Sequence, residues 1–380
     1  MRANAIALAV AFALLNLSAS ANEEPNDLPE LAVVVENYRD GETQSYPIAL
    51  LEGTIVGEDS GVVVVENLSS NRRDRISRAN AFEGRFKVLI ELVPGENRLL
   101  LSSGAKSESL TLNYRTSSNP HFVRLVYFVD SSGDLTFPQD DSWEPRSKDF
   151  AQKMRVAALL WQTATAESFR KAGLGRRTFT LEFDKEGNVV VWIKRGKKRV
   201  EEYLEMSEKD LFRQTRKEIL ADDGNSLFAK NFAMIAFARR EPNNGDVRGR
   251  VALGGGGIGI LDASTLFAWP DSLESVPTLF SDSSPIPQNY LRDSAYRNAR
   301  WALASSSLGA GLHELGHAFD LDHSDDPCDF MSRGFDMFNR IFTPFEPGFA
   351  SEDGSFSETE TARWGKSSVA RLLSSPWIKE

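Results

Sequence analysis

The chain has 380 residues, with 44 Lys and Arg against 54 Asp and Glu, which gives a formal net charge of −10. An acidic surface argues against nucleic acid and anionic membranes as partners. Cys328 is the single cysteine, so no internal disulfide can form and the fold must rely on its hydrophobic core. A chain of this length exceeds one typical domain and suggests two.

The pattern of residues 1–21 predicts a cleaved signal peptide, with the sequence MRANAIALAVAFALLNLSASA. Arg2 precedes an uncharged apolar run, and the segment ends in Ala19-Ser20-Ala21, which matches an A-x-A cleavage site. The run is shorter than the ~20 apolar residues that a transmembrane helix needs. We therefore expect a secreted or periplasmic protein that keeps no membrane anchor after cleavage.

Residues 28–116 predict an all-β domain. Short β-rich runs such as SYPIALLEGTIVG and GRFKVLIELV follow one another at intervals of about 10 residues, separated by turn residues such as Pro94-Gly95. This spacing is typical of a β-sandwich. The segment GRFKVLIELVPGENRLLL also resembles the extracellular immunoglobulin-like modules that bacteria place beside enzymes. The resemblance implies a fold and no activity.

Residues 119–380 predict a second domain of α/β or α+β type, which follows a join at residues 116–122. Strands are expected at FVRLVYFVD, RTFTLEFD, NVVVWIKR and KNFAMIAFARR. Helices are expected at residues 148–173 and 207–220, the second starting at Ser207 with Asp210 three residues on, a capping pattern. Strands that alternate with helices indicate a sheet covered by helices.

The segment HELGHAFDLDH, residues 313–323, holds three of the four histidines of the chain. An apolar stripe with helical spacing runs along it: Leu308, Leu312, Leu315 and Phe319. At ~100° per residue, His313 and His317 lie on the face away from that stripe. Histidines four residues apart on a helix stack one turn apart, close enough to share a metal ion.

Zinc prefers imidazole nitrogen, and a catalytic zinc takes three protein ligands. His323 is the natural third ligand, but a continuing helix would rotate it by ~240° and carry it ~9 Å along the axis. The chain is therefore expected to turn back near Asp320. Glu314, next to the first ligand, would then lie beside a zinc-activated water, whose proton it could take and pass to a leaving amine.

This segment resembles the HExxHxxGxxH motif of the metzincin zinc peptidases. The resemblance implies that His313, His317 and His323 bind one catalytic Zn²⁺ and that Glu314 is the general base. Met331, in the following CDFMSRG, matches the methionine turn beneath the metal, and MSRGFDMFNR is similar to a family of metzincin-type metallopeptidases. Asp320 stands where metzincins usually have a glycine in a left-handed turn, a conformation that aspartate tolerates next best.

The stretch LGGGGIGILDAS precedes the expected zinc helix. In metzincins an edge strand forms the rim of the cleft and binds substrate as an added strand. Four residues are the candidates for such a rim: Ile258, Gly259, Ile260 and Leu261. A glycine-rich surface loop is an equally good interpretation of this stretch.

Together these patterns predict a secreted zinc metalloendopeptidase that hydrolyses protein or peptide substrates. The complete set of three histidines and Glu314 favours an enzyme, because a scaffold could lose any of them at no cost. One alternative is a secreted binding or adhesion protein with a non-proteolytic metzincin-like scaffold, and another is a zinc hydrolase that acts on a non-peptide amide. The sequence names neither the substrate nor the oligomeric state.

Overall fold

The computed structural model describes residues 32–72, 75–139, 147–221, 227–240, 247–286, 297–348 and 354–379. The expected signal peptide, residues 1–21, lies outside these ranges. Within them, no helix combines the length and the apolar character that a membrane crossing requires.

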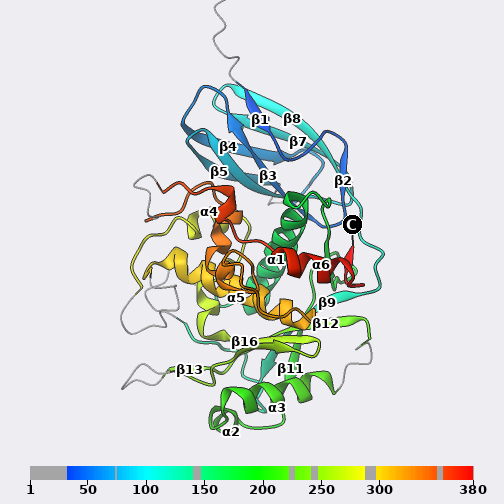
Figure 1. Ribbon diagram of the computed structural model, residues 1–380, viewed down its shortest axis with the longest axis vertical. Coiled ribbons are helices and arrows are strands. Elements are labelled where there is room, and N and C mark those ends of the chain that lie inside the picture. Colours follow the sequence, from blue (N-terminus) through cyan, green and yellow to red (C-terminus); the bar gives the residue numbers. More distant parts are fainter. Residues whose placement is uncertain are drawn as a thin grey trace, which may run out of the picture. The chain divides into compact units, whose positions relative to one another are not determined.

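The first sheet has eight strands in the order β1-β3-β6-β5-β4-β7-β8-β2 (Figure 1). These are β1 (Val33–Val35), β2 (Glu42–Gln44), β3 (Ile48–Ile55), β4 (Ser60–Asn67), β5 (Ile76–Phe82), β6 (Arg85–Glu91), β7 (Gly95–Ser103) and β8 (Lys106–Tyr114). Neighbouring strands are antiparallel, except that β2 runs parallel to β8. Buried and exposed residues alternate in β7, as expected of a strand with one face in a core. The β-rich expectation for residues 28–116 is met in the described residues 32–72 and 75–116, while the immunoglobulin-like assignment stays a prediction.

The second sheet is mostly parallel, in the order β15-β16-β12-β9-β10-β17, with β11 also paired to β9. Its strands are β9 (Phe122–Val129), β10 (Thr178–Leu181), β11 (Val191–Arg195), β12 (Ala229–Ile235), β15 (Ala252–Gly255), β16 (Ile258–Asp262) and β17 (Ile378–Lys379). The two end strands, β15 and β17, are antiparallel to their neighbours. A separate two-stranded ribbon pairs β13 (Arg239–Arg240) with β14 (Val247–Arg248).

Helices cover both faces of this second sheet (Figure 1). They are α1 (Phe150–Lys171), α2 (Val200–Leu204), α3 (Glu208–Leu220), α4 (Ser275–Leu279), α5 (Arg300–Ala318) and α6 (Lys366–Leu373), with short 3₁₀ helices η1 (Ala263–Ala268), η2 (Arg333–Ile341) and η3 (Glu358–Glu360). Leu125 and Tyr127 of β9 share a core with α1 and α5. Val126 and Phe128, on the opposite face of the same strand, pack with residues of α2 and α3. The expected helix-covered sheet is therefore confirmed.

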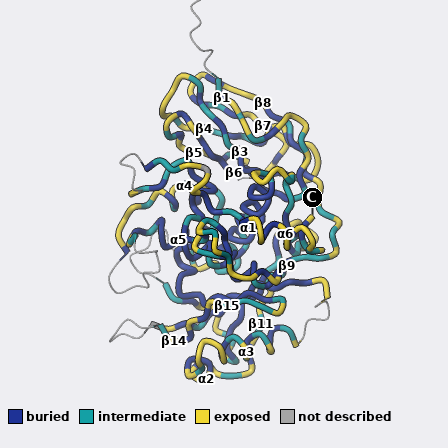
Figure 2. The backbone as a smooth tube through the Cα atoms, in the orientation of Figure 1, coloured by how far each residue is buried: buried dark blue, intermediate teal, exposed yellow. Residues whose placement is uncertain are grey.

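The two helices expected in this region are present. Asp149 caps α1 by accepting a hydrogen bond from the Gln152 backbone N–H at 2.9 Å. Ser207 caps α3 by accepting one from the Asp210 backbone N–H at 3.3 Å. Most of α1 and α5 is buried, so both helices belong to the interior of the protein (Figure 2).

Candidate metal centre

Helix α5 carries the first two histidines of the motif and is fixed by its neighbours. The expected apolar stripe is buried: Leu308, Leu312, Leu315 and Phe319. Trp161 of α1 donates a hydrogen bond from Nε1 to the Leu308 carbonyl at 2.8 Å. A methyl group at Gly311 would overlap the Trp161 ring, so this glycine allows the two helices to approach closely.

The glycine-rich stretch lets α5 lie directly on the sheet. Gly254 of β15 and Gly259 of β16 are cross-strand partners. A methyl group on either residue would lie 2.5 Å from the backbone oxygen of Glu314. Because only a hydrogen atom fits in this space, the two glycines set the distance between the helix and the sheet at Glu314.

The prediction that Ile258, Gly259, Ile260 and Leu261 form an edge strand is wrong. These residues belong to β16, which is buried throughout and pairs with β12 on one side and β15 on the other. The edge strand is β15, which is partly exposed. The apolar run of β16 is typical of a strand buried inside a sheet.

Helix α5 ends at Ala318, and Asp320 adopts a left-handed conformation with φ of 66°. Its backbone N–H donates to the His317 carbonyl at 3.0 Å, and the Leu321 N–H donates to the Gly316 carbonyl at 3.1 Å. This pair of hydrogen bonds is the Schellman closure of a helix. The expected reversal of the chain at Asp320 is confirmed.

The turn brings His323 back to the two helix histidines. One ring nitrogen from each of His313, His317 and His323 lies within 4.8 Å of the others. The Nε2 atoms of His317 and His323 are 3.2 Å apart. Among the described residues, these three histidines form the one group of His, Cys, Asp and Glu side chains placed to hold a metal ion. The fourth histidine, His121, instead packs against Trp377 at a ring distance of 4.8 Å.

Backbone carbonyls fix the orientation of both helix histidines. Nδ1 of His313 lies 2.6 Å from the Phe330 oxygen, and Nδ1 of His317 lies 2.8 Å from the Leu321 oxygen. A carbonyl can only accept, so each Nδ1 donates and each Nε2 keeps a lone pair. Burial lowers the pKa of His313 to about 4 and also lowers that of His317. Both rings therefore favour the neutral form that binds a metal.

Glu314, the residue after His313, has a buried carboxyl group, with 6% of its surface exposed. Among the described residues its Oε2 has no hydrogen-bond partner. Burial raises the pKa of Glu314 to about 8, with a smaller contribution from the negative charge of Glu208. A buried carboxylate without a partner is costly, and a cation beside it would offset that cost.

Met331 lies beneath α5 and is fully buried. A methyl group at Gly316 would overlap its Sδ, so this glycine allows the methionine to reach the helix. Asp329 shapes the turn, because its carboxylate accepts hydrogen bonds from the Met331 N–H at 3.0 Å and from the Ser368 hydroxyl at 2.8 Å. The structure thus places a methionine under the histidine-bearing helix. Sequence reasoning missed the support from Asp329, because Ser368 lies 39 residues away.

Two other residues near Met331 do not join the histidine cluster. Cys328 is partly buried, and its Sγ donates to the Thr359 carbonyl at 3.4 Å. Arg333 is largely exposed and pairs with Asp336 at 2.6 Å. Phe335 follows it and packs edge-on against the His313 ring, with centroids 5.2 Å apart. Phe335 therefore covers one side of the histidine cluster.

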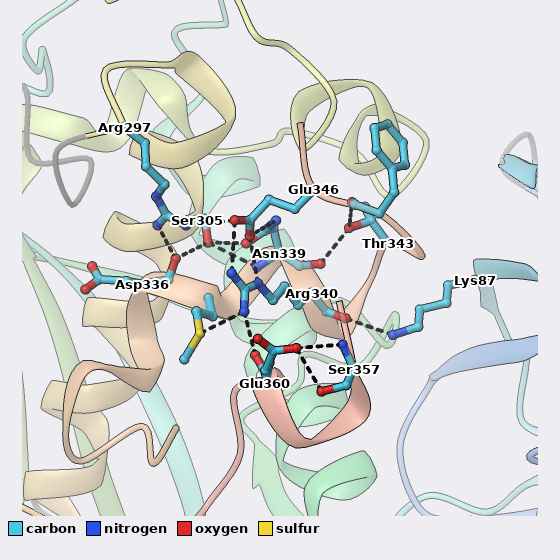
Figure 3. A network of polar contacts seen from close by, with 12 residues as sticks. Lys87, Arg297, Ser305, Asp336, Asn339, Arg340, Thr343, Glu346, Ser357 and Glu360 are labelled. Atoms are coloured by element: carbon cyan, nitrogen blue, oxygen red, sulfur yellow. Dashed lines mark hydrogen bonds and ion pairs between the residues drawn. The ribbon is translucent and has the colours of Figure 1, made fainter. Parts of the chain in front are cut away.

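A buried polar network holds η2 against α5 (Figure 3). Arg340 and Glu346 are almost fully buried and pair at 2.9 Å. Asn339 donates to Glu346 at 3.0 Å and accepts from the Ser305 hydroxyl of α5 at 2.8 Å. Lys87 of the first sheet donates to the Arg340 carbonyl at 2.8 Å. Hydrogen bonds therefore hold the segment that follows Met331 both to α5 and to the first sheet.

A family model described as "Putative peptidase family" matches residues 32–380. The chain belongs to this family. A protein of Schizosaccharomyces pombe named "putative zinc metalloproteinase" is 30% identical to it over 285 residues, which cover 69% of this chain and 45% of the relative. A protein of Saccharomyces cerevisiae with the same descriptive name is 24% identical over 329 residues, covering 73% of this chain and 47% of the relative. The chain thus spans less than half the length of these two relatives.

The fold also overlaps with a solved structure. Catalytically inactive OgpA from Akkermansia muciniphila, in complex with an O-glycopeptide substrate, is 16% identical to this chain. The overlap covers 68% of this chain and 61% of that one, with a TM-score of 0.43.

Proposed function

We propose that this member of the peptidase family is a zinc-dependent metallopeptidase in which His313, His317 and His323 hold one Zn²⁺. The observation that carries the proposal is the convergence of three imidazoles, two of them oriented through Nδ1 by backbone carbonyls. Zinc takes imidazole nitrogen at ~2.0–2.1 Å, and three protein ligands leave one position open for a reactant.

The donor set fits a divalent cation. The two helix histidines favour their neutral form, and the Nε2 atoms of His317 and His323 lie 3.2 Å apart. Unprotonated nitrogens this close repel one another unless a proton or a cation lies between them. The unpartnered buried carboxyl of Glu314 also favours a positive charge nearby.

Held by His313, His317 and His323, a zinc ion would supply Lewis acidity, which would polarise a substrate carbonyl and lower the pKa of a water molecule. Glu314 would accept the proton of the attacking water and deliver it to the leaving amine nitrogen. Its Oε2 has no hydrogen-bond partner among the described residues that would compete for this role. We further propose that Met331 supports the metal from below, as the methionine turn of metzincins does.

For the substrate we propose a peptide bound along β15. This strand ends the sheet order, so its outer edge can pair with an extended peptide, and it lies against α5 at Glu314 and His317. β15 replaces Ile258–Leu261 in the role of the rim.

We also propose three features that the sequence predicts: export directed by residues 1–21, an immunoglobulin-like class for the first sheet, and a division into domains at residues 28–116 and 119–380.

The test compares the wild type with Glu314→Gln, using protein without residues 1–21 and a defined peptide pool. Glutamine cannot accept the proton, so hydrolysis should fall by roughly 10²–10⁴-fold or more while the bound zinc is retained. Glu186→Gln, at an exposed position, should match the wild type.

Each other outcome has a distinct meaning. Undiminished hydrolysis by Glu314→Gln would remove Glu314 from the mechanism. A zinc-loaded wild type that cleaves no peptide would favour the binding-protein alternative. Cleavage of non-peptide amides alone would favour the second alternative.

A further inference from the structure

The turn at Asp320 sets the position of two of the three histidines. His323 reaches the cluster because Asp320 reverses the chain with φ of 66°. The Leu321 carbonyl, which belongs to the same turn, lies 2.8 Å from Nδ1 of His317 and so orients that ring. A residue that stabilises this turn therefore acts on two metal ligands together.

Aspartate is not the residue that this conformation favours. A left-handed φ brings Cβ close to the backbone, and glycine alone adopts it freely. The backbone hydrogen bonds of the Schellman closure are the same for any residue at this position. A further interaction that uses the side chain of Asp320 would explain why aspartate is accommodated here.

Lys230 provides such an interaction. It lies near the start of β12, 90 positions before Asp320, and its Nζ is 3.0 Å from Asp320 Oδ2. Its side chain is 10% exposed, whereas that of Asp320 is 66% exposed. In the described part of the chain, Asp320 is the one carboxylate within ion-pair distance of Lys230. A buried ammonium is costly unless it is paired, so Lys230 draws the Asp320 carboxylate toward the sheet.

Trp377, near the C-terminus, holds Lys230 in place. Its Nζ lies 4.7 Å from the centroid of the Trp377 ring, within the range of a cation–π interaction. Nε1 of Trp377 donates to the Phe228 carbonyl at 3.0 Å, next to the first residue of β12. The position of Lys230 is thus fixed by contacts independent of α5, and it can act as an anchor for the turn.

We propose that Lys230 is a positioning residue for the metal centre: its ion pair with Asp320 holds the left-handed turn that places His323 and orients His317. This inference rests on the proposed zinc site. In this proposal, the ion pair stabilises the left-handed turn, which a glycine at position 320 would adopt without such a partner.

The test measures zinc affinity by competition with a chromophoric chelator in the full mature chain. Lys230→Met keeps the length of the side chain but removes the charge, and it should bind zinc roughly 10- to 100-fold more weakly, as for other residues that orient metal ligands. Asp320→Ala should weaken binding in the same way, and Asp320→Gly should restore it. Lys217→Met, at an exposed position on α3, is the matched control and should not change the affinity.

The double variants decide whether Lys230 acts through the turn. In the Asp320→Gly background, Lys230→Met should change zinc affinity little, because glycine adopts the turn without an ion pair. Equal weakening in both backgrounds would overturn the inference, as would wild-type affinity in Lys230→Met. If Lys230→Met fails to fold, the exposed Asp320→Ala carries the test, and its wild-type affinity would also overturn the inference. A wild type that binds no zinc would instead remove the proposed function.

Discussion

The histidine segment and the first sheet differ in how far along the sequence their contacts reach. Within the histidine segment, the contact of His317 with Leu321 spans 4 residues, and His313 contacts Phe330, which lies shortly after the segment, across 17 residues. The hydrogen bonds between the first sheet and the rest of the chain connect residues that are much farther apart in the sequence. Glu52 accepts from Arg170 across 118 residues, and Lys87 donates to the Arg340 carbonyl across 253.

The difference shows which parts of a structure a local motif can encode. Neighbouring residues form the histidine cluster, so their spacing alone predicts much of its geometry. The first sheet is held by charged groups that no local pattern marks. Arg176 is the clearest of these, since its side chain is 6% exposed and pairs with buried Glu167 at 2.8 Å. It also donates to the Asn37 carbonyl at 2.6 Å and stacks over the Tyr38 ring at 3.6 Å.

The largest expected effect on stability comes from removing this arginine. Arg176→Leu would leave buried Glu167 with Arg170 as its remaining cationic partner, and we expect a loss of roughly 3–5 kcal/mol in the free energy of unfolding. Arg213→Leu removes an arginine from an exposed pair with Asp210 and should cost about 0–1 kcal/mol. Denaturant titration of both variants measures the difference.

The same titration tests whether the two regions unfold together. Because Arg176 joins the first sheet to α1 and its surroundings, one cooperative transition is expected for the whole chain. Separate transitions would show that the first sheet unfolds independently of the second region. Equal costs for Arg176→Leu and Arg213→Leu would contradict the stabilising role given to Arg176.

A smaller effect is expected from a pair of glycine substitutions, one in each region. At Gly259 a methyl group would lie 2.5 Å from the Glu314 backbone oxygen, so α5 must shift. Gly259→Ala should therefore cost about 1–3 kcal/mol and also weaken zinc binding. At Gly61 the neighbours are the ends of the Ser103 and Ile55 side chains, at 3.1 and 3.2 Å, which can move. Gly61→Ala should cost less and leave zinc affinity unchanged, and the reverse order would contradict the role given to Gly259.

Much of the second region could be predicted from its sequence. Regular spacing of apolar residues predicts α1 and α3, and a serine before an acidic first turn predicts the cap of α3, where Ser207 accepts from Asp210. The geometry of a helix predicts that the chain must reverse before His323, and the structure places Asp320 in a left-handed conformation. The helices and their caps depend on neighbouring residues, so the local sequence determines them, whereas the turn at Asp320 also pairs with the distant Lys230.

Features that depend on distant residues could not be predicted. The sequence leaves Ile258–Leu261 open as a rim strand or a surface loop, and neither is found, because pairing with β12 and β15 makes this strand internal. The glycines instead allow α5 to lie close against the sheet. Lys230 and the Arg340–Glu346 pair carried no recognisable pattern, because charged residues are common on surfaces and only the fold shows that these are buried.

The central claim is that three imidazole nitrogens form the metal site, and X-ray absorption at the zinc edge of the purified mature protein tests it most directly. The account predicts one zinc per chain, with three imidazole nitrogens at ~2.0–2.1 Å and one further light atom. A sulfur ligand at ~2.3 Å would place Cys328 on the metal and contradict the claim. A protein that binds no stoichiometric zinc, or whose zinc has fewer than three imidazole ligands, would contradict it as well.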